Sequence, residues 1–164
     1  MPDRNYWLVK SEPEVFSYDD LASGPKQTTH WDGVRNYAAR NHLKAMKKGD
    51  LVFFYHSNAA PAAIVGVAEV VREAYPDASA FDSADSHFDP KSKRDDPTWF
   101  MVDIKAVEPL PRPVSLDEVK NTKGLENMAL IRLGRLSVQP VTKSEYDTIR
   151  KLAAKPAKNA KAAS

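Results

Sequence analysis

The sheet of this protein is encoded by two apolar runs, LVFFYH at Leu51–His56 and AIVGVAEVV at Ala63–Val71. Both are nearly continuous and rich in β-branched or aromatic residues, which is typical of buried strands. The residues between them, 57 to 61, make only a short connection. A connection of that length joins neighbouring strands that run in opposite directions, so the two runs are predicted to pair antiparallel.

Two further apolar runs flank this pair. Residues Tyr6–Lys10 are aromatic and β-branched, and Pro13 follows closely, which predicts a first strand. Residues Trp99–Val107 alternate well enough to predict a strand with one solvated face. The prolines at positions 109, 111 and 113 are expected to end that strand, because proline cannot donate to a ladder of hydrogen bonds.

Capping residues predict helices between the strands. A short helix starts at Ser17 and is stopped by Gly24-Pro25, and a longer one spans residues 36–48 and ends at Gly49. Two more segments with a serine or threonine cap are predicted to be helical, residues 115–120 and 142–153. Strands and helices alternate too little for a doubly wound sheet. The predicted fold class is therefore α+β, a curved and mostly antiparallel sheet or barrel with flanking helices.

Composition limits the possible functions. A chain of 164 residues makes one domain of ordinary size, predicted over residues 1–154. The absence of cysteine excludes a disulfide framework, a zinc ribbon and a thiol nucleophile. The four histidines show no pair at metal-ligand spacing, so we expect neither a metal nor a cofactor. Charged residues near the start and the lack of a long apolar run predict a protein that is neither secreted nor in a membrane, and is cytoplasmic, nucleoid or nuclear.

The net charge of +2 belongs to the end of the chain. Residues 151–164 contain four lysines and no acid, so the remainder of the chain carries a net charge of −2. Residues 155–164 hold no large apolar side chain and are predicted to form a disordered tail. Its spaced lysines suit contacts with nucleic-acid phosphates, but a solubilising end with no partner explains them equally well.

A long polar segment lies between Tyr75 and Pro97 and contains six aspartates. It is longer than an ordinary connection, which indicates either a lid or a floppy loop. The aspartates do not follow the spacing of a calcium-binding loop, since the glycine and glutamate of that motif are missing.

The segment WDGVRNY, at Trp31–Tyr37, carries more hydrogen-bonding groups than core packing explains. It combines a flat ring for stacking, a glycine that permits close approach of the backbone, and amide and guanidinium donors. Those groups can hold one planar heterocycle by its face and its edge, as sites for an extruded base do. The segment is interpreted as the wall of a binding pocket rather than as a catalytic site.

Several motifs in order along the chain together resemble the EVE domain family, from about Tyr6 to Leu152. They are KSEP at 10–13, WDGVRNY at 31–37, FFYHS at 53–57, YPD at 75–77, PTW at 97–99 and RLSVQP at 135–140. The resemblance implies a PUA-like fold, an antiparallel sheet curled into a barrel. It also implies kinship with the YTH readers of methylated adenine in RNA, and a nucleic-acid partner with a modified base, modified cytosine in DNA foremost.

The resemblance implies roles for particular residues. Trp31 is expected to stack on the base and Trp99 to form a second wall, while Asn36 meets the Watson–Crick edge. Phosphates, exocyclic oxygens or the base edge are expected to contact Lys10, Ser11, Arg35 and Arg135. The other residues assigned to the same pocket are Val34, Tyr37, Tyr55, His56 and Ser57.

Other interpretations stay open from sequence alone. Arg35 and Arg135 could each hold an acidic residue of the fold, and His56 could be a structural hydrogen bonder. An enzyme acting on a modified base is the main alternative, with His56 and either Glu12 or Asp32 as acid and base, although no familiar catalytic motif is present. A PUA-like module for structured RNA is the other. We expect a monomer that binds weakly and in a salt-sensitive manner, because stacking roughly balances the cost of extracting a base.

Overall fold

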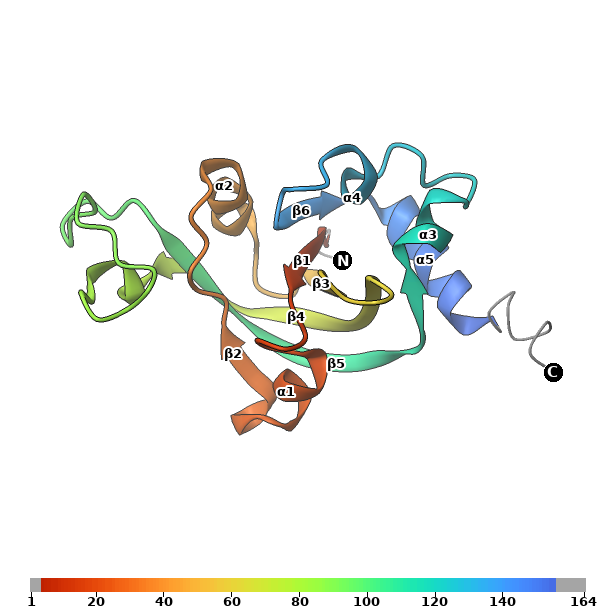
Figure 1. The fold of residues 1–164 in the computed structure, drawn as a ribbon, viewed down its shortest axis with the longest axis horizontal. Coiled ribbons are helices and arrows are strands. Elements are labelled where there is room, and N and C mark those ends of the chain that lie inside the picture. The colour runs from red at the N-terminus through yellow and green to blue at the C-terminus, as the bar shows by residue number, and fades with distance from the viewer. Residues whose placement is uncertain (1–3, 156–164) are drawn as a thin grey trace.

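A computed structural model describes residues 4–155 and is built around one six-stranded sheet (Figure 1). The strand order is β2-β5-β4-β3-β1-β6, so the sheet is open, with β2 and β6 at its edges. Neighbouring strands are antiparallel except for β1 and β3, which are parallel. The strands are β1 (Tyr6–Ser11), β2 (Thr28–His30), β3 (Leu51–His56), β4 (Ala63–Pro76), β5 (Phe100–Ser115) and β6 (Val138–Val141). The α+β class and the antiparallel pairing of the two central runs are confirmed.

The parallel pairing of β1 with β3, two inner strands of the sheet, brings their C-terminal ends together. Their register runs from Tyr6 opposite Leu51 to Ser11 opposite His56, so both strands end side by side. Parallel neighbours require a crossover connection, and the chain makes it through α1, β2 and α2. The segment between β2 and α2 holds residues 31–36 of the WDGVRNY motif and lies beside the end of β1.

Strand β5 is longer than predicted, because it continues through all three prolines to Ser115. Strand β2 pairs with only residues 103–105 of β5, so within residues 4–155 the rest of that edge has no strand partner. Prolines at 109, 111 and 113 alternate and therefore turn their nitrogens to the same side of the strand. On an open edge a missing N–H removes no ladder hydrogen bond, so these prolines are tolerated.

In the described part of the chain five α-helices pack around the sheet, and the predicted caps are present. Ser17 and Thr142 each form a capping box, with Asp20 and Glu145 respectively, and Ser115 accepts a hydrogen bond from the Glu118 N–H. The helices are α1 (Tyr18–Ser23), α2 (Tyr37–Ala45), α3 (Leu116–Lys120), α4 (Ala129–Arg132) and α5 (Lys143–Ala154), with 3₁₀ turns η1 (Pro25–Gln27) and η2 (Ala78–Phe81). Among residues 4–155 no helix has the length and apolarity that crossing a membrane requires.

Helix α2 ends three residues earlier than predicted. Met46 is already extended and fully buried, while the carboxylate of buried Asp50 accepts hydrogen bonds from the Lys47 N–H and the Trp7 indole. These contacts draw the chain out of the helix before Gly49 is reached. Gly49, with φ of +95°, forms the turn into β3 instead.

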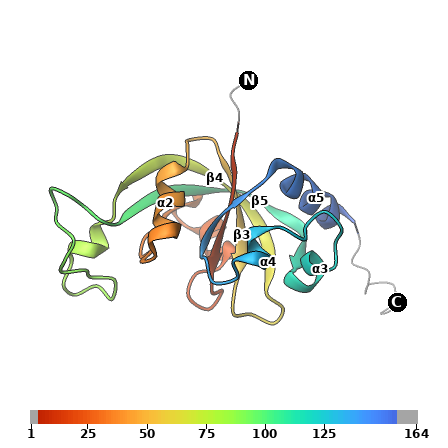
Figure 2. The ribbon, with the colours of Figure 1, turned by 90° about the horizontal axis from the view of Figure 1, so that it is seen from above.

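The two faces of the sheet bury separate apolar clusters. Alternation along β3 sends Val52 and Phe54 to the cluster that contains α1 and α2, and sends Phe53 and Tyr55 to the cluster that contains α3, α4 and α5. Figure 2 shows α3 and α5 gathered at the end where the chain leaves, while the long segment after β4 projects at the opposite end. The predicted tail, apart from Lys155, lies outside the described residues and stays a prediction.

Candidate functional site

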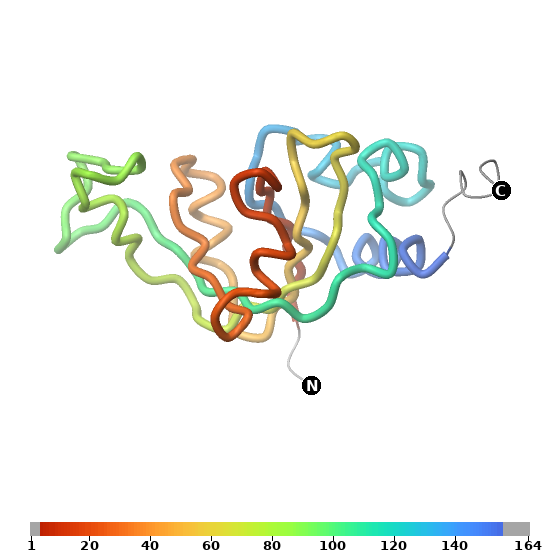
Figure 3. Tube along the Cα trace, turned by 60° about the horizontal axis from the view of Figure 1, so that its bottom comes forward, coloured from red at the N-terminus to blue at the C-terminus, as the bar shows by residue number. Residues whose placement is uncertain are grey.

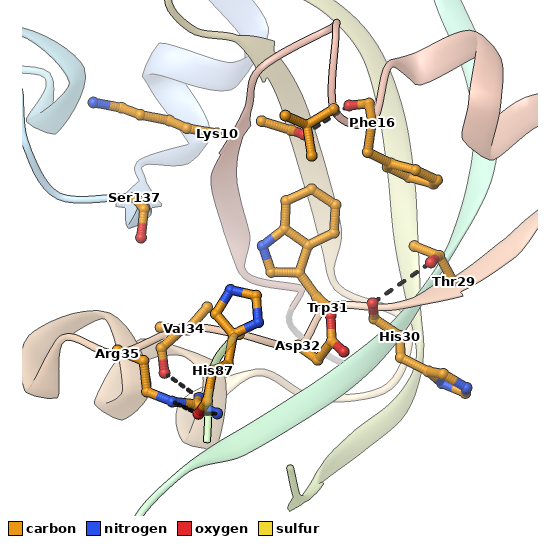
Figure 4. Close-up of a pocket in the computed structure, with 13 residues that line it drawn as sticks. Lys10, Phe16, Thr29, His30, Trp31, Asp32, Val34, Arg35, His87 and Ser137 are labelled. Atoms are coloured by element: carbon orange, nitrogen blue, oxygen red, sulfur yellow. Dashed lines mark hydrogen bonds between the residues drawn. The ribbon is translucent and has the colours of Figure 1, made fainter. Parts of the chain in front are cut away.

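A cleft of about 520 Å³ opens where the ends of β1 and β2 meet the segment that leads into α2 (Figure 4). Its volume is in the range of small-molecule sites in proteins. The residues lining it are Lys10, Ser11, Val15, Phe16, Thr29, His30, Trp31, Asp32, Gly33, Val34, Arg35, His87 and Ser137. Five residues predicted from sequence are therefore brought together here: Lys10, Ser11, Trp31, Val34 and Arg35.

Trp31 stands in the middle of this lining (Figure 4). Its backbone N–H donates to the Val102 carbonyl at 2.7 Å, which fixes the residue to β5. Its ring meets Phe54 and Phe16 edge to face, with centroids 5.4 and 6.5 Å apart. These two aromatic rings hold the indole in place, while the partly buried side chain of Trp31 still borders the cleft. This arrangement suits a stacking platform, and that role remains a prediction.

Gly33 is required by both its conformation and its neighbour. Its φ is +77°, a value that favours glycine, and a Cβ there would lie 2.8 Å from Nε2 of His87. The close approach that the sequence predicted is therefore made by the imidazole of His87. Asp85 accepts a hydrogen bond from the His87 N–H at 2.8 Å and lies 3.1 Å from its Nδ1. Sequence reasoning missed His87; the only available signal was the unusual length of the segment that contains it.

Arg35 borders the cleft, but its guanidinium binds the segment of residues 77–99, which we call the cap. Its N–H groups donate to the His87 carbonyl at 2.9 and 2.7 Å, to Asp77 at 3.1 Å and to Ser79 at 3.1 Å. Arg35 therefore holds an acidic residue of the fold, as one of the two interpretations from sequence had it. Its guanidinium N–H groups donate to acceptors of the protein.

Asp77 is the anchor of the cap. Its side chain is fully buried and accepts hydrogen bonds from the Gly33 N–H at 2.8 Å and from both the N–H and hydroxyl of Ser79. Burial raises the pKa of the Asp77 carboxyl, but the hydrogen bonds from Ser79, Gly33 and Arg35 outweigh it, and the pKa lies below its ordinary value. The cap is thus tied at Asp77 to the cleft wall.

Trp99 is buried in the attachment of the cap and is not among the residues lining the cleft. Its indole N–H donates to Asp89 at 2.6 Å, and Tyr37 stacks on its ring at 5.1 Å. The Arg35 guanidinium lies 5.3 Å from the same ring. Trp99 and Tyr37 thus pair with each other outside the lining of this cleft, and a place for them in a base-binding site stays a prediction.

Lys10 and Ser11 lie at the rim. The Ser11 hydroxyl donates to the Phe16 carbonyl at 2.6 Å, and Lys10 donates to the Gly134 carbonyl at 2.5 Å. Partial burial lowers the pKa of the Lys10 ammonium. No carboxylate of the described residues forms an ion pair with Lys10, so its charge is available to an anionic ligand.

The remaining predicted residues are placed elsewhere. Asn36 caps α2, since its side-chain oxygen accepts from the Ala39 N–H, and Arg135 is exposed in the loop before β6. Tyr55 is buried in the cluster on the other face of the sheet. His56 accepts the Tyr18 N–H at Nε2, and burial lowers the pKa of its imidazole. Ser57 donates its N–H to the Ser11 carbonyl. None of the five is among the residues lining this cleft, so their part in binding a base stays a prediction.

A second feature that sequence reasoning missed is a polar triangle at the cleft rim. His30, which lines the cleft, lies 2.9 Å from both Asp103 and the Tyr75 hydroxyl through its Nδ1, and Tyr75 donates to Asp103 at 2.5 Å. Burial and the bond to Asp103 raise the pKa of Tyr75. The triangle fixes the imidazole of His30 on the side of Trp31 away from Lys10 (Figure 4). Within residues 4–155 no three His, Asp or Glu side chains are grouped so as to hold a metal ion.

Comparisons with known proteins agree with this architecture. The family model of the EVE domain matches residues 5–152. Thymocyte nuclear protein 1 of Rattus norvegicus is 50% identical over 165 residues, covering 90% of this chain and 73% of the relative. The human THYN1 protein, solved in complex with 5-methylcytosine-containing DNA, superposes with a TM-score of 0.90 at 45% identity, covering 93% of this chain and 99% of that one.

A more distant likeness concerns the fold alone. The YTH domain of Zygosaccharomyces rouxii MRB1, solved with N6-methyladenosine RNA, has a TM-score of 0.55 at 15% identity, covering 95% of this chain and 88% of that one.

Proposed function

The chain belongs to the EVE domain family, and on that premise we propose that it is a nucleic-acid-binding module that reads a modified base, modified cytosine in DNA first of all. The observation that carries the proposal is the cleft around Trp31, which has the size for a planar heterocycle and an aromatic ring held from behind. The similarity to a human protein solved with 5-methylcytosine-containing DNA supports cytosine as the first base to test.

In this proposal the base stacks on Trp31 and its edge meets polar groups of the lining. The carboxylate of Asp32 can accept from the exocyclic amine of cytosine, and the hydroxyl of Ser137 can donate to a ring acceptor. Val34 and Phe16 offer apolar contact to a methyl group. One methyl group contributes only about 1–3 kcal/mol to discrimination, so the preference for the modified base is expected to be moderate.

Binding rather than catalysis is favoured by the positions of the titratable groups. The acid–base pair expected for an enzyme was His56 with Glu12 or Asp32. The imidazole of His56 accepts from Tyr18 and is not part of the cleft, whereas Asp32 is, and Glu12 accepts from Asn58. These groups are therefore not arranged beside one bound base for proton transfer.

The test is a binding titration with fluorescently labelled oligonucleotides that carry plain, methylated or hydroxymethylated cytosine, or plain or N6-methylated adenine, as DNA and as RNA. We expect one modified base to be preferred by the wild type. Trp31→Ala should weaken that binding by roughly 5- to 150-fold, the equivalent of about 1–3 kcal/mol of base stacking. Trp31→Phe, which keeps a flat ring, serves as the matched control and should retain most of the affinity.

Two outcomes would contradict the proposal. Binding that ignores the modification, or binding that is equal in wild type and Trp31→Ala, would mean that nucleic acid is held outside the cleft. A stronger response to RNA than to DNA would instead favour the RNA-binding alternative at the same site.

We also propose a location beside genomic DNA, in a nucleus or nucleoid. The name thymocyte nuclear protein, carried by several relatives, supports the nuclear alternative, while the comparisons give no support to a cytoplasmic one. A monomeric state remains a prediction.

A further inference from the structure

We propose that the loop of residues 12–16, which we call the rim loop, is a wedge whose tip, Val15, enters a DNA duplex at the place that the extruded base has left. The inference rests on the proposed function and extends it, because it makes double-stranded DNA the substrate and assigns the opening step to a particular side chain. The rim loop connects β1 to α1 and contributes Val15 and Phe16 to the cleft lining.

Val15 is unusual in being apolar, exposed and next to the cleft. Its exposed fraction is 77%, larger than that of the other exposed large hydrophobic residues of the described chain. A single exposed valine is common on protein surfaces and by itself indicates nothing. Its position is the informative feature, since Phe16, the next residue, packs edge to face against Trp31. A base stacked on Trp31 therefore leaves its duplex close to the tip of the rim loop.

The rim loop is braced, so Val15 is held in its exposed position. The Glu12 carbonyl accepts from the N–H groups of Val15 and Phe16, both at 2.9 Å, and the Phe16 carbonyl accepts from the Ser11 hydroxyl. The hairpin between β3 and β4 supports the loop from the side, because Asn58 donates to the Glu12 carboxylate at 3.0 Å. Figure 3 shows the β1–α1 connection beside that hairpin at the same edge of the molecule. A pre-ordered tip loses little entropy when it inserts.

The charges of the rim loop favour base steps over the phosphate backbone. Glu12 and Glu14 both precede the tip and are both exposed, and carboxylates are repelled by phosphates. Carboxylates do accept the N–H groups of bases, including those that a base exposes when its pairing partner leaves. The basic rim residue, Lys10, lies on the strand that precedes the loop, where it can meet the backbone. Val15 at the tip is thus suited to contact stacked bases, and Lys10 on β1 is suited to contact phosphates.

An inserted side chain also helps to offset the free-energy cost of extracting a base from a duplex. Removing a base from a duplex costs a few kcal/mol, and one aromatic stack returns about 1–3 kcal/mol. Proteins that open base steps commonly insert an apolar side chain, which fills the gap and keeps water from it. The side chain of Val15 supplies that contact only when the target is double-stranded.

The experiment compares Val15→Thr with wild type on one modified-cytosine sequence, presented as a duplex and as a single strand. Threonine keeps the shape of valine and replaces a methyl group with a hydroxyl, which finds no partner between stacked bases. We expect Val15→Thr to lower the ratio of duplex to single-strand affinity by roughly five- to ten-fold relative to wild type. Val107→Thr is the matched control, because Val107 is also exposed, at 50%, but lies on β5 outside the cleft lining.

The outcomes separate this inference from the function on which it rests. An unchanged ratio of duplex to single-strand affinity in Val15→Thr overturns the wedge, as does a wild type that binds the modified single strand but not the duplex. The proposed function survives both results. A wild type without preference for any modified base removes the proposed function and the wedge with it.

Discussion

The cleft and the cap each contain a tryptophan, and they use it in opposite ways. Trp31 borders the cleft, and its ring packs edge to face against Phe54 and against Phe16, which also lines the cleft. Trp99 is buried, donates its indole N–H to Asp89 and stacks with Tyr37. Both were predicted as walls of one pocket. The difference teaches that a tryptophan in a polar motif can serve the ligand or the fold. Which of the two it serves depends on whether its indole N–H and ring face are used by the protein or left open to the cleft.

The largest expected effect concerns the anchor of the cap. Asp77→Asn keeps the size of the side chain but removes the charge that faces Arg35, whose side chain is 22% exposed. Breaking a buried ion pair on one side costs about 3–5 kcal/mol, and the partial exposure of Arg35 places the expected loss of unfolding free energy near about 3 kcal/mol. Chemical denaturation measures it.

The control for Asp77→Asn lies in the same cap. Asp82 is exposed and accepts only a local hydrogen bond from the Ala84 N–H, so Asp82→Asn should change stability by less than about 0.5 kcal/mol. Equal effects of the two variants would show that the cap is not held through Asp77.

The same anchor predicts a dependence on pH. The pKa of Asp77 is lower in the folded protein than the ordinary value of 3.8, so its contribution to stability is fully present above about pH 4 and is lost as the pH falls through the folded pKa. The difference in unfolding free energy between wild type and Asp77→Asn should therefore shrink as the pH is lowered from 6 toward 3. A difference that stays constant over that range would mean that the charge of Asp77 does not contribute.

The two tryptophans can be compared directly by the same conservative change. Trp99→Phe removes the bond to Asp89 and some buried area, and should lower the unfolding free energy by about 1–2 kcal/mol with less than about a two-fold change in oligonucleotide binding. Trp31→Phe keeps a flat ring beside the cleft, and in the described residues the Trp31 indole nitrogen makes no hydrogen bond that the change would break, so it should retain most of the affinity and lower the unfolding free energy by less than Trp99→Phe does. Reversed effects would exchange the roles of the two residues.

The sequence predicted those features that depend on interactions between residues close together in the chain. Serine and threonine caps at positions 17, 115 and 142 mark helix starts because the cap and its partner N–H are three residues apart. The central hairpin was predictable because its strands are apolar throughout and its loop is short. The continuation of β5 through three prolines was not, because the cost of a proline depends on whether that edge is paired, which is a property of the whole sheet.

The site was predictable in part for the same reason. Trp31 and Gly33 were found because their motif is compact, whereas His87 and the anchor Asp77 reach the cleft from more than forty residues away. Alternation along β3 places Tyr55 and His56 on opposite faces of the sheet, and Tyr55 packs into the cluster that contains α3, α4 and α5.

The smallest expected effect belongs to the rim of the cleft and concerns salt rather than stability. Lys10→Gln removes a cation whose hydrogen bond goes to the exposed carbonyl of Gly134, so the unfolding free energy should change by less than about 0.5 kcal/mol. If the ammonium of Lys10 contacts one phosphate, the slope of log affinity against log salt should become shallower by about 0.7 on single strands and about 0.9 on duplex DNA. Lys123→Gln, an exposed lysine that follows α3, is the control and should leave the slope unchanged. Equal slopes for wild type and Lys10→Gln would place the phosphates away from β1. The bound nucleic acid would then have to approach the cleft from the side of His30.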